Sequence, residues 1–299
     1  MPKMFFAVNV KAGKKAIVPV LADILSIFNA ADYEVTVYVT QKAKELPNVI
    51  EREAPKYDAV VCSGGDGTLN EAVTGLLRLK KRPPIGFIPA GTSNDTVTNL
   101  GLPRKLTDAA KIIVNGYTQP VDVGKMNDRY FNYIAAFGNF IEASFDTPRE
   151  AKNAVGSLAY IMNFIRLLPT AKPIRVRAEF DGGSFEGNII VGMASNGKVM
   201  AGIPLGKQID ASVNDGLTEL IFIKTLKDMI SFQELLEDFA AGEVGENEAF
   251  FWRRVKRVKI ESELALPWTL DGEYGGTHKK VEIENLPSAV RIFVPEKKA

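Results

Sequence analysis

One stretch, residues 60–73, constrains the fold of this chain more than any other part of its sequence. It reads VVCS at 60–63, GGDGT at 64–68 and LNEAV at 69–73. The apolar start predicts a buried strand, and the apolar positions from 69 onward follow the spacing of an amphipathic helix. Glycines at such a junction let consecutive backbone N–H groups converge on an anion, and the helix N-terminus adds partial positive charge. The stretch therefore predicts a phosphate-binding loop between a strand and a helix; an ordinary tight turn is the alternative.

Asp66 stands out within this loop. A carboxylate beside bound phosphates repels them unless it serves a metal ion or a proton transfer. We therefore expect catalytic chemistry near the loop. As a residue of a solvated loop, Asp66 is expected to matter for turnover and little for the stability of the fold.

A second loop has the same character. The apolar segment PIGFIP at 84–89 leads into AGTSND at 90–95, and residues 96–100 can form a helical turn. In open α/β sheets, ligands bind at the carboxyl ends of the strands. Two such loops on neighbouring strands are expected to face one ligand, and a helix cap by Ser93 or Asn94 is compatible with that role.

The first 122 residues alternate between strand and helix patterns. The expected strands are 4–10, 34–40, 60–63 and 84–89, and the expected helices are 14–29, 42–54, 69 onward and 106–114. This alternation predicts a doubly wound α/β domain with a parallel sheet.

Beyond residue 122 strand patterns dominate. They cover 130–137, 174–180, 185–193, 217–223, 255–262, 267–271, 280–284 and 289–294, with helical segments at 147–168 and 226–241. A short turn at residues 181–183 joins two of these strands as a hairpin. The pattern predicts an antiparallel β-sandwich domain.

The composition narrows the functions that are open to the chain. A net charge of +1 gives no global field for nucleic acid. The single Cys62 fits a reducing compartment, and the single His278 leaves proton transfer to a carboxylate or a lysine. There is neither a run of ~20 apolar residues nor a signal-peptide pattern, so we expect a soluble cytoplasmic protein.

Five motifs occur in an order that resembles one family. They are GGDGTLNEAVTG at 64–75, GFIPAGTSND at 86–95, VDVGKMN at 121–127, NDG at 214–216 and LDGEYGG at 270–276. Together they resemble the soluble diacylglycerol kinases, a family that includes bacterial lipid kinases, sphingosine kinases and ceramide kinases. The likeness is strongest to the Gram-positive diacylglycerol kinases, although NAD kinases share GGDGT.

The resemblance covers nearly the whole chain and implies an activity. It implies transfer of the γ-phosphate of ATP, with Mg²⁺, to the primary hydroxyl of diacylglycerol, giving phosphatidic acid. It implies a catalytic domain at 1–122, a lipid-substrate domain at 123–289, and a tail from about 290 to 299 that returns to the first domain. The enzyme would contact the membrane peripherally and transiently, without nucleic acid, and a homodimer stays open.

The nucleotide site combines the glycine loops with residues that the resemblance adds. The expected set is Asn9, Gly13, Lys14, Thr40, Gly64, Gly65, Asp66, Gly67, Thr68, Thr92 and Asn94. In the first loop Val10 stands where relatives usually carry proline. An equally good alternative is that Thr40 is a strand-end residue that caps the next helix.

Asp271 and Glu273 form a second acidic pair. At positions i and i+2 of an extended segment their side chains would share one face. The resemblance assigns the general base to this motif. We favour Glu273 as proton acceptor, with Asp271 positioning metal or substrate; the reverse division and a simple acidic hairpin turn remain alternatives.

The segment around Asp215 resembles the family's structural magnesium site. The resemblance assigns the carboxylate of Asp215 and the backbone carbonyls of Ser212 and Leu217 as ligands. Asn214 replaces an aspartate that relatives usually carry, which removes one negative charge. A plain turn is the alternative.

Other functions also remain open from the sequence. The substrate could be another lipid alcohol, such as a sphingoid base or undecaprenol, or a soluble alcohol as for NAD kinases. A degenerate nucleotide- or lipid-binding protein is the non-enzymatic alternative. The apolar segment 155–168 could contact lipid or pack in the core.

Overall fold

The computed structural model describes residues 1–91, 94–139, 170–197, 199–200, 203–204, 211–225, 237 and 249–296. The predicted helices at 147–168 and 226–241, apart from Glu237, and the apolar segment 155–168 lie outside these residues. The chain forms two compact units, Met1–Val121 with Ser288–Ala299, and Asp122–Pro287. We call them unit 1 and unit 2.

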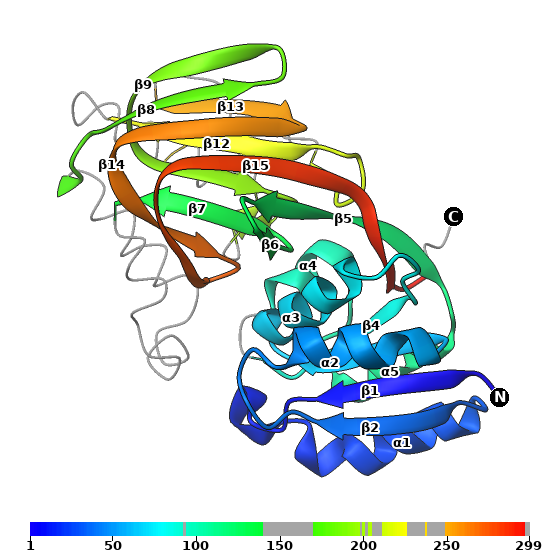
Figure 1. Ribbon diagram of the computed structural model, residues 1–299. Helices are drawn as coiled ribbons and strands as arrows, with labels where there is room; N and C mark the ends of the chain where they lie inside the picture. The colour runs from blue at the N-terminus through cyan, green and yellow to red at the C-terminus, as the bar shows by residue number, and fades with distance from the viewer. Residues whose placement is uncertain are drawn as a thin grey trace. The chain divides into compact units, whose positions relative to one another are not determined.

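Unit 1 is a parallel sheet with helices, as the alternating pattern predicts. The strands are β1 (Lys3–Val8), β2 (Glu34–Val39), β3 (Ala59–Gly64) and β4 (Ile85–Pro89). The α-helices are α1 (Leu21–Ala30), α2 (Leu46–Glu53), α3 (Asp66–Leu77), α4 (Asp95–Leu100) and α5 (Leu106–Val114). The strands lie in the order β2-β1-β3-β4 and are all parallel. Figure 1 shows β1 and β2 side by side at one edge of this sheet.

Both faces of this sheet are buried. Phe5 and Phe6 follow each other in β1 and point to opposite faces, yet both are buried. Phe6 packs edge-on against Phe28 of α1, and Phe5 contacts Tyr38 and Tyr57. Continuous apolar strands such as β1 are the expected signature of a parallel sheet covered on both sides.

The N-terminal helix is shorter than predicted. We expected residues 14–29, but α1 begins at Leu21 and two short 3₁₀ segments, Ala12–Lys15 and Val18–Val20, precede it. Pro19 sits in the first turn of the second segment, where its missing N–H is tolerated, and it cannot continue a helix from residue 14. The expected helix 42–54 likewise starts only at Leu46.

The chain end completes unit 1. The long strand β15 (Glu273–Phe293) starts in unit 2, and its Ile292 pairs in parallel with Ile85 of β4. Arg82 donates to the carbonyl of Ala289 at 2.6 Å, and Arg291 donates to the carbonyl and hydroxyl of Thr118 at 2.9 Å. These contacts fasten the last strand to the body of unit 1.

Unit 2 is an antiparallel β structure in which two layers share their long strands. Its strands include β5 (Thr118–Met126), β6 (Arg129–Phe131), β7 (Ile134–Gly138), β8 (Ile174–Phe180), β9 (Gly183–Ser195), β12 (Thr218–Lys224), β13 (Phe250–Val255) and β14 (Arg257–Leu270), together with most of β15. Both β7 and β8 pair with β9 and with β14, so the two long strands pass from one layer into the other. The predicted β-sandwich is confirmed.

The core of unit 2 is aromatic. Phe137 and Trp268 stack with ring centroids 4.3 Å apart, and Phe185, Phe222 and Phe251 contact one another. Two pairs of predicted strands each prove to be one continuous strand. Most of 255–262 and 267–271 falls in β14, and 280–284 and nearly all of 289–294 fall in β15. Irregular register between Glu261 and Leu266 lets β14 bend, which hid its continuity from the alternation pattern.

None of the helices in the part of the chain that the structure describes is long and apolar enough to cross a membrane.

Unit 2 also encloses an acidic side chain. Glu219 on β12 is fully buried, and its Oε1 lies 3.9 Å from Nε of Arg254. Burial, together with the nearby Asp215 carboxylate, raises the pKa of Glu219 to about 8, while Arg254 acts in the opposite direction. The folded protein therefore keeps a proton on Glu219 at pH values where the unfolded chain has lost it.

This proton predicts how stability depends on pH. The folded pKa is raised, so between about pH 4.5 and pH 8 the folded state binds the extra proton and the free energy of unfolding falls as pH rises. The loss from this group is at most about 1.4 kcal/mol per pH unit. Chemical denaturation at pH 6 and pH 8 should show a smaller decrease for Glu219→Gln than for the wild type. Equal pH dependence of the two proteins would show that Glu219 is not protonated in the fold.

Candidate active site

The strand order of unit 1 has a switch point between β1 and β3. In the order β2-β1-β3-β4 the chain moves outward in opposite directions from β1 and β3. The connections after β1 and β3 therefore lead to strands on opposite sides, and ligands of open α/β sheets bind at such a switch point. The loop after β1 holds residues 9–15, and the loop after β3 holds Gly65.

Three loops pack backbone to backbone at this edge. Gly91, after β4, donates its N–H to the carbonyl of Gly64 at 2.9 Å. A Cβ on Gly91 would overlap the Cα of Gly65, and a Cβ on Gly13 would overlap the carbonyl oxygen of Ala90. Gly13 also has φ +49°, which favours glycine. The two glycine loops predicted to face one ligand, and the first loop with them, do come together.

Asn9 ties the first loop to GGDGT. Its Nδ2 donates to Oγ1 of Thr68 at 3.2 Å, its Oδ1 accepts the N–H of Lys11 at 3.1 Å, and its own N–H donates to the carbonyl of Ser63 at 2.9 Å. Lys14 lies exposed on the same loop with φ +57°. Such non-glycine left-handed residues cost free energy and cluster at functional sites.

The N-terminus of α3 supplies the N–H groups for an anion. The helix starts at Asp66, three residues earlier than predicted, with Gly65 as its N-cap. The first N–H groups of a helix have no partner within it, which leaves those of Gly65, Asp66 and Gly67 at the carboxyl end of β3 without a partner inside α3. Thr68 differs from our expectation, because its N–H donates to the carbonyl of Gly65 at 2.9 Å. Gly64 contributes its carbonyl to Gly91 as described above.

Asp66 joins the second loop to the first. Its Oδ2 accepts the N–H of Asp95 at 3.1 Å and its Oδ1 accepts the N–H of Thr96 at 3.2 Å. Burial raises the pKa of Asp66, and the hydrogen bonds from Thr96, Asp95 and Asn94 oppose this shift. We expected a solvated carboxylate, and this is wrong: Asp66 is only 9 % exposed and caps the start of α4.

Asp95 was not singled out in the sequence. It follows the second loop as the first residue of α4, directly beside Asp66. Burial, together with the Asp66 carboxylate, raises the pKa of Asp95 to about 6, and Arg104 opposes the shift. The signal that could have marked it is an aspartate directly after GTSN, which matches the aspartate of the first glycine loop. Carboxylates with displaced pKa values concentrate at active sites.

Three further predicted nucleotide residues have different outcomes. Asn94 is 4 % exposed and donates to the carbonyls of Pro89 and Gly91, so it closes the second loop on itself. Thr40 donates its N–H to the carbonyl of Val8 at 3.0 Å and is half-buried at the end of β2. Thr92 lies outside the described residues.

Asp271 and Glu273 lie in unit 2, at the hairpin between β14 and β15. Asp271 and Gly272 form its two-residue turn with φ +50° and +82°, and Leu270 pairs with Glu273. Both φ values are those of the turn that favours Asp-Gly. The segment is therefore not extended, so the reason for which we expected both carboxylates to share one face does not hold.

The two carboxylates have different surroundings. Asp271 is 6 % exposed and accepts the N–H groups of Asn132, Tyr133 and Ile134 at 2.7, 3.0 and 3.1 Å. Its own N–H donates to the carbonyl of Ile134 at 2.9 Å. Glu273 is half-buried at the start of β15. Asp271 is thus held by the fold, whereas Glu273 keeps access to solvent.

A buried chain of hydrogen bonds runs from this hairpin to the NDG loop. Asn196 donates its N–H to the carbonyl of Tyr133 at 2.9 Å and its Nδ2 to the carbonyl of Asp122 at 2.7 Å. Asp122 in turn accepts the N–H of Gly216 at 2.6 Å and donates its N–H to the carbonyl of Val213 at 2.8 Å. These hydrogen bonds connect the hairpin to the NDG loop through Asn196 and Asp122.

The three predicted magnesium ligands lie together but do not fit a divalent cation well. Asp215 Oδ1 accepts the N–H of Leu217 at 2.9 Å, and its Oδ2 forms an ion pair with Arg254. The carbonyl of Leu217 accepts Nδ2 of Asn285 at 2.9 Å. Among the described residues no cluster of three acidic, histidine or cysteine side chains could hold a metal ion.

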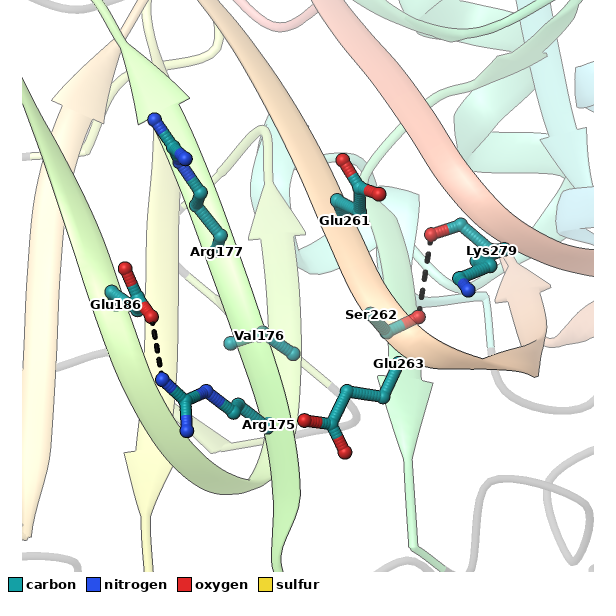
Figure 2. Close-up of a pocket in the computed structure, with 8 residues that line it drawn as sticks. All are labelled: Arg175, Val176, Arg177, Glu186, Glu261, Ser262, Glu263 and Lys279. Atoms are coloured by element: carbon teal, nitrogen blue, oxygen red, sulfur yellow. Dashed lines mark hydrogen bonds and ion pairs between the residues drawn. The ribbon is translucent and has the colours of Figure 1, made fainter.

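A charged pocket lies elsewhere in unit 2. It has a volume of about 220 Å³ and lies between β8, β9, β14 and β15 (Figure 2). It is lined by Arg175, Val176, Arg177, Glu186, Glu261, Ser262, Glu263 and Lys279. Arg175 is paired with Glu186 at 2.8 Å, and the three basic and three acidic side chains balance. It contains none of the predicted site residues.

Comparisons with known proteins identify the family. Residues 3–126 match the diacylglycerol kinase catalytic domain, and residues 142–294 match the YegS C-terminal NAD kinase beta sandwich-like domain. Diacylglycerol kinase of Bacillus subtilis (strain 168) is 32% identical over 293 residues, covering 97% of this chain and 96% of that protein. Diacylglycerol kinase of Staphylococcus carnosus (strain TM300) is 33% identical over 290 residues, covering 96% and 94%.

Solved structures agree with the sequence relatives. A crystal structure described as a diacylglycerol kinase from Bacillus anthracis str. Sterne has a TM-score of 0.78 at 25% identity and covers 98% of this chain and 97% of that chain. A second crystal structure from the same organism reaches a TM-score of 0.86 at 27% identity with the same coverage. With both of its parts and nearly its full length matched, the chain belongs to the diacylglycerol kinase family.

Proposed function

We propose that this protein is an ATP-dependent lipid kinase that phosphorylates the primary hydroxyl of diacylglycerol and produces phosphatidic acid and ADP. The observation that carries the proposal is the meeting of three glycine-containing loops at the switch point of unit 1. The names of the curated relatives support diacylglycerol as the lipid. The Asp-Gly-Glu hairpin of unit 2 supports a transfer reaction over simple nucleotide binding.

The loops of unit 1 bind the phosphates of ATP in this proposal. The N–H groups of Gly65, Asp66 and Gly67 and the N-terminus of α3 attract the phosphate oxygens. Lys14 adds positive charge from the first loop. Mg²⁺ bound with ATP would neutralise the charge that develops on the transferred group, as in other phosphoryl transfers.

Glu273 accepts the proton of the lipid hydroxyl. The hydroxyl oxygen bonds to the γ-phosphorus, the bond from that phosphorus to the bridging oxygen breaks, and ADP leaves with the electron pair. Asp271 is the positioning residue, because its carboxylate already accepts three N–H groups. The carbonyl of Glu273 accepts the hydroxyl of Thr269 at 3.2 Å, which fixes the backbone from which the base projects.

A transfer assay tests this function. The purified chain, radiolabelled ATP and Mg²⁺ are incubated with mixed micelles that contain diacylglycerol, a sphingoid base or undecaprenol, and in a separate reaction with NAD. We expect label in phosphatidic acid and much less in the other acceptors. Label only in NAD would show that the substrate is soluble and not a lipid. ATP binding without label in any acceptor would indicate a binding protein.

Gly65→Ala tests whether a ligand occupies the glycine loop. Among the described residues, a Cβ at Gly65 would meet the Cα of Gly91 alone, at an ordinary 3.5 Å, and its φ of −93° suits alanine. The fold therefore accepts the change, but the methyl group would project at the phosphate-binding N–H groups. We expect an unchanged Tm and a loss of ATP affinity of at least ~10-fold by calorimetry, about 1.4 kcal/mol. ATP binding equal to that of the wild type would show that the phosphates do not bind at this loop.

Asp66→Asn tests the carboxylate that links the loops. The amide would place an NH₂ group against one of the two backbone N–H donors, so one buried hydrogen bond is lost. We expect the free energy of unfolding to fall by about 1–3 kcal/mol and kinase activity to fall with it. Chemical denaturation and the transfer assay on the same preparation measure both. An inactive variant with wild-type stability would instead indicate a direct role at the metal or nucleotide.

Glu273→Gln and Asp271→Asn separate the base from the positioning residue. Glu273→Gln should lower turnover by ~10²–10⁴-fold with Tm and ATP affinity unchanged, because a positioned base contributes that much. Asp271→Asn should lower Tm as well as turnover, because its three N–H donors lose a charged acceptor. If Glu273→Gln turned over normally and Asp271→Asn were inactive with a normal Tm, Asp271 would be the base and Glu273 the positioning residue.

A further inference from the structure

Arg254 lies where the family resemblance places a metal ion. It sits on β13 directly opposite Glu219 of β12, in an antiparallel pair that runs from Thr218 with Val255 to Ile223 with Phe250. The NDG loop leads into β12, so this register brings the guanidinium to the loop. There Arg254 Nη2 donates to Oδ2 of Asp215 in an ion pair.

Two of the three predicted ligand groups, the Asp215 carboxylate and the Leu217 carbonyl, already accept hydrogen bonds within the protein. Asp215 has one oxygen on the N–H of Leu217 and the other on Arg254. The carbonyl of Leu217 accepts Nδ2 of Asn285, which also contacts Oγ1 of Thr218 at 3.2 Å. Ser212 donates its hydroxyl to Oδ1 of Asn214 at 2.8 Å. The loop is closed by hydrogen bonds within the protein.

Charge and geometry both favour the guanidinium over a divalent cation. Mg²⁺ requires near-octahedral oxygen ligands at 2.0–2.1 Å as a general rule, and a guanidinium in contact with the same carboxylate repels it. Asn214 is neutral, so the motif offers one carboxylate where relatives usually have two. The side chains of Asp215 and Arg254 are 21% and 30% exposed, which keeps solvent from screening the pair completely.

We propose that Arg254 is the built-in cation of this loop and holds residues 212–217 in place without a bound divalent metal. The loop carries Gly216, whose N–H binds Asp122, and Asp122 belongs to the hydrogen-bond chain that ends at the Asp271 hairpin. Arg254 therefore acts as a positioning residue for unit 2, and Mg²⁺ enters the enzyme only with its nucleotide.

Thermal melting without nucleotide tests this proposal independently of the kinase assay. Wild type, Asp215→Asn, Arg254→Met and the double variant are each melted in EDTA and in excess MgCl₂. Arg254→Met keeps the alkyl chain and removes the charge. We expect the same wild-type Tm in both buffers, a fall of roughly 2–4 °C or more for each single variant, and a double variant no less stable than the worse single one, since the two changes remove one shared interaction.

Two further variants serve as controls. Arg253→Met removes the neighbouring arginine of β13, which lies over the ring of Phe251 at 5.0 Å, and should melt independently of Asp215→Asn. Arg254→Lys restores the charge and should recover part of the lost Tm if Arg254→Met folds poorly. A wild-type Tm that rises with MgCl₂ and loses this rise in Asp215→Asn would overturn the proposal. So would an Arg254→Met variant as stable as wild type, or additive effects of Asp215→Asn and Arg254→Met.

Discussion

The hydrogen bonds that Asp66 accepts from the N–H groups of Asp95 and Thr96 hold the nucleotide loops of unit 1 together. Asp66 stands at the start of α3 and binds the start of α4, so one carboxylate aligns the helices that follow two neighbouring strands. The glycines then let the backbones approach within hydrogen-bond distance, as between Gly91 and Gly64. The acceptor role of Asp66 thus explains a carboxylate within a glycine loop, because both of its oxygens accept N–H groups at the start of α4.

Local signals predicted the architecture of unit 1 well. Strand β3, the glycine loop and α5 were readable because continuous apolar runs and 3.6-residue periodicity are strong local patterns. The start of α1 was misplaced because Pro19 and the left-handed run at Gly13, Lys14 and Lys15 act through backbone geometry that periodicity does not record. In unit 2 the bend of β14 depends on pairing with both β7 and β8, a long-range feature.

The candidate site could be predicted only as a set of residues. The sequence identified the glycine loops and the Asp-Gly-Glu motif, but which groups the fold already uses depends on partners far along the chain. Asp271 is held by N–H groups about 140 positions earlier, and Asp215 by Arg254 on another strand. The contact of Asp95 with Asp66, which lies on another loop, likewise became evident only in the structure. Residue types therefore indicated the chemistry, while the division into reacting and positioning groups needed the structure.

The most direct test of the account is a crystal structure of the protein with a non-hydrolysable ATP analogue and Mg²⁺. The account predicts phosphate oxygens within hydrogen-bond distance of the N–H groups of Gly65, Asp66 and Gly67, at the carboxyl ends of β1 and β3, with the carboxylate of Asp66 still bound to Asp95 and Thr96. An analogue bound elsewhere on the chain, or an Asp66 turned away from α4 to contact the nucleotide, would contradict it.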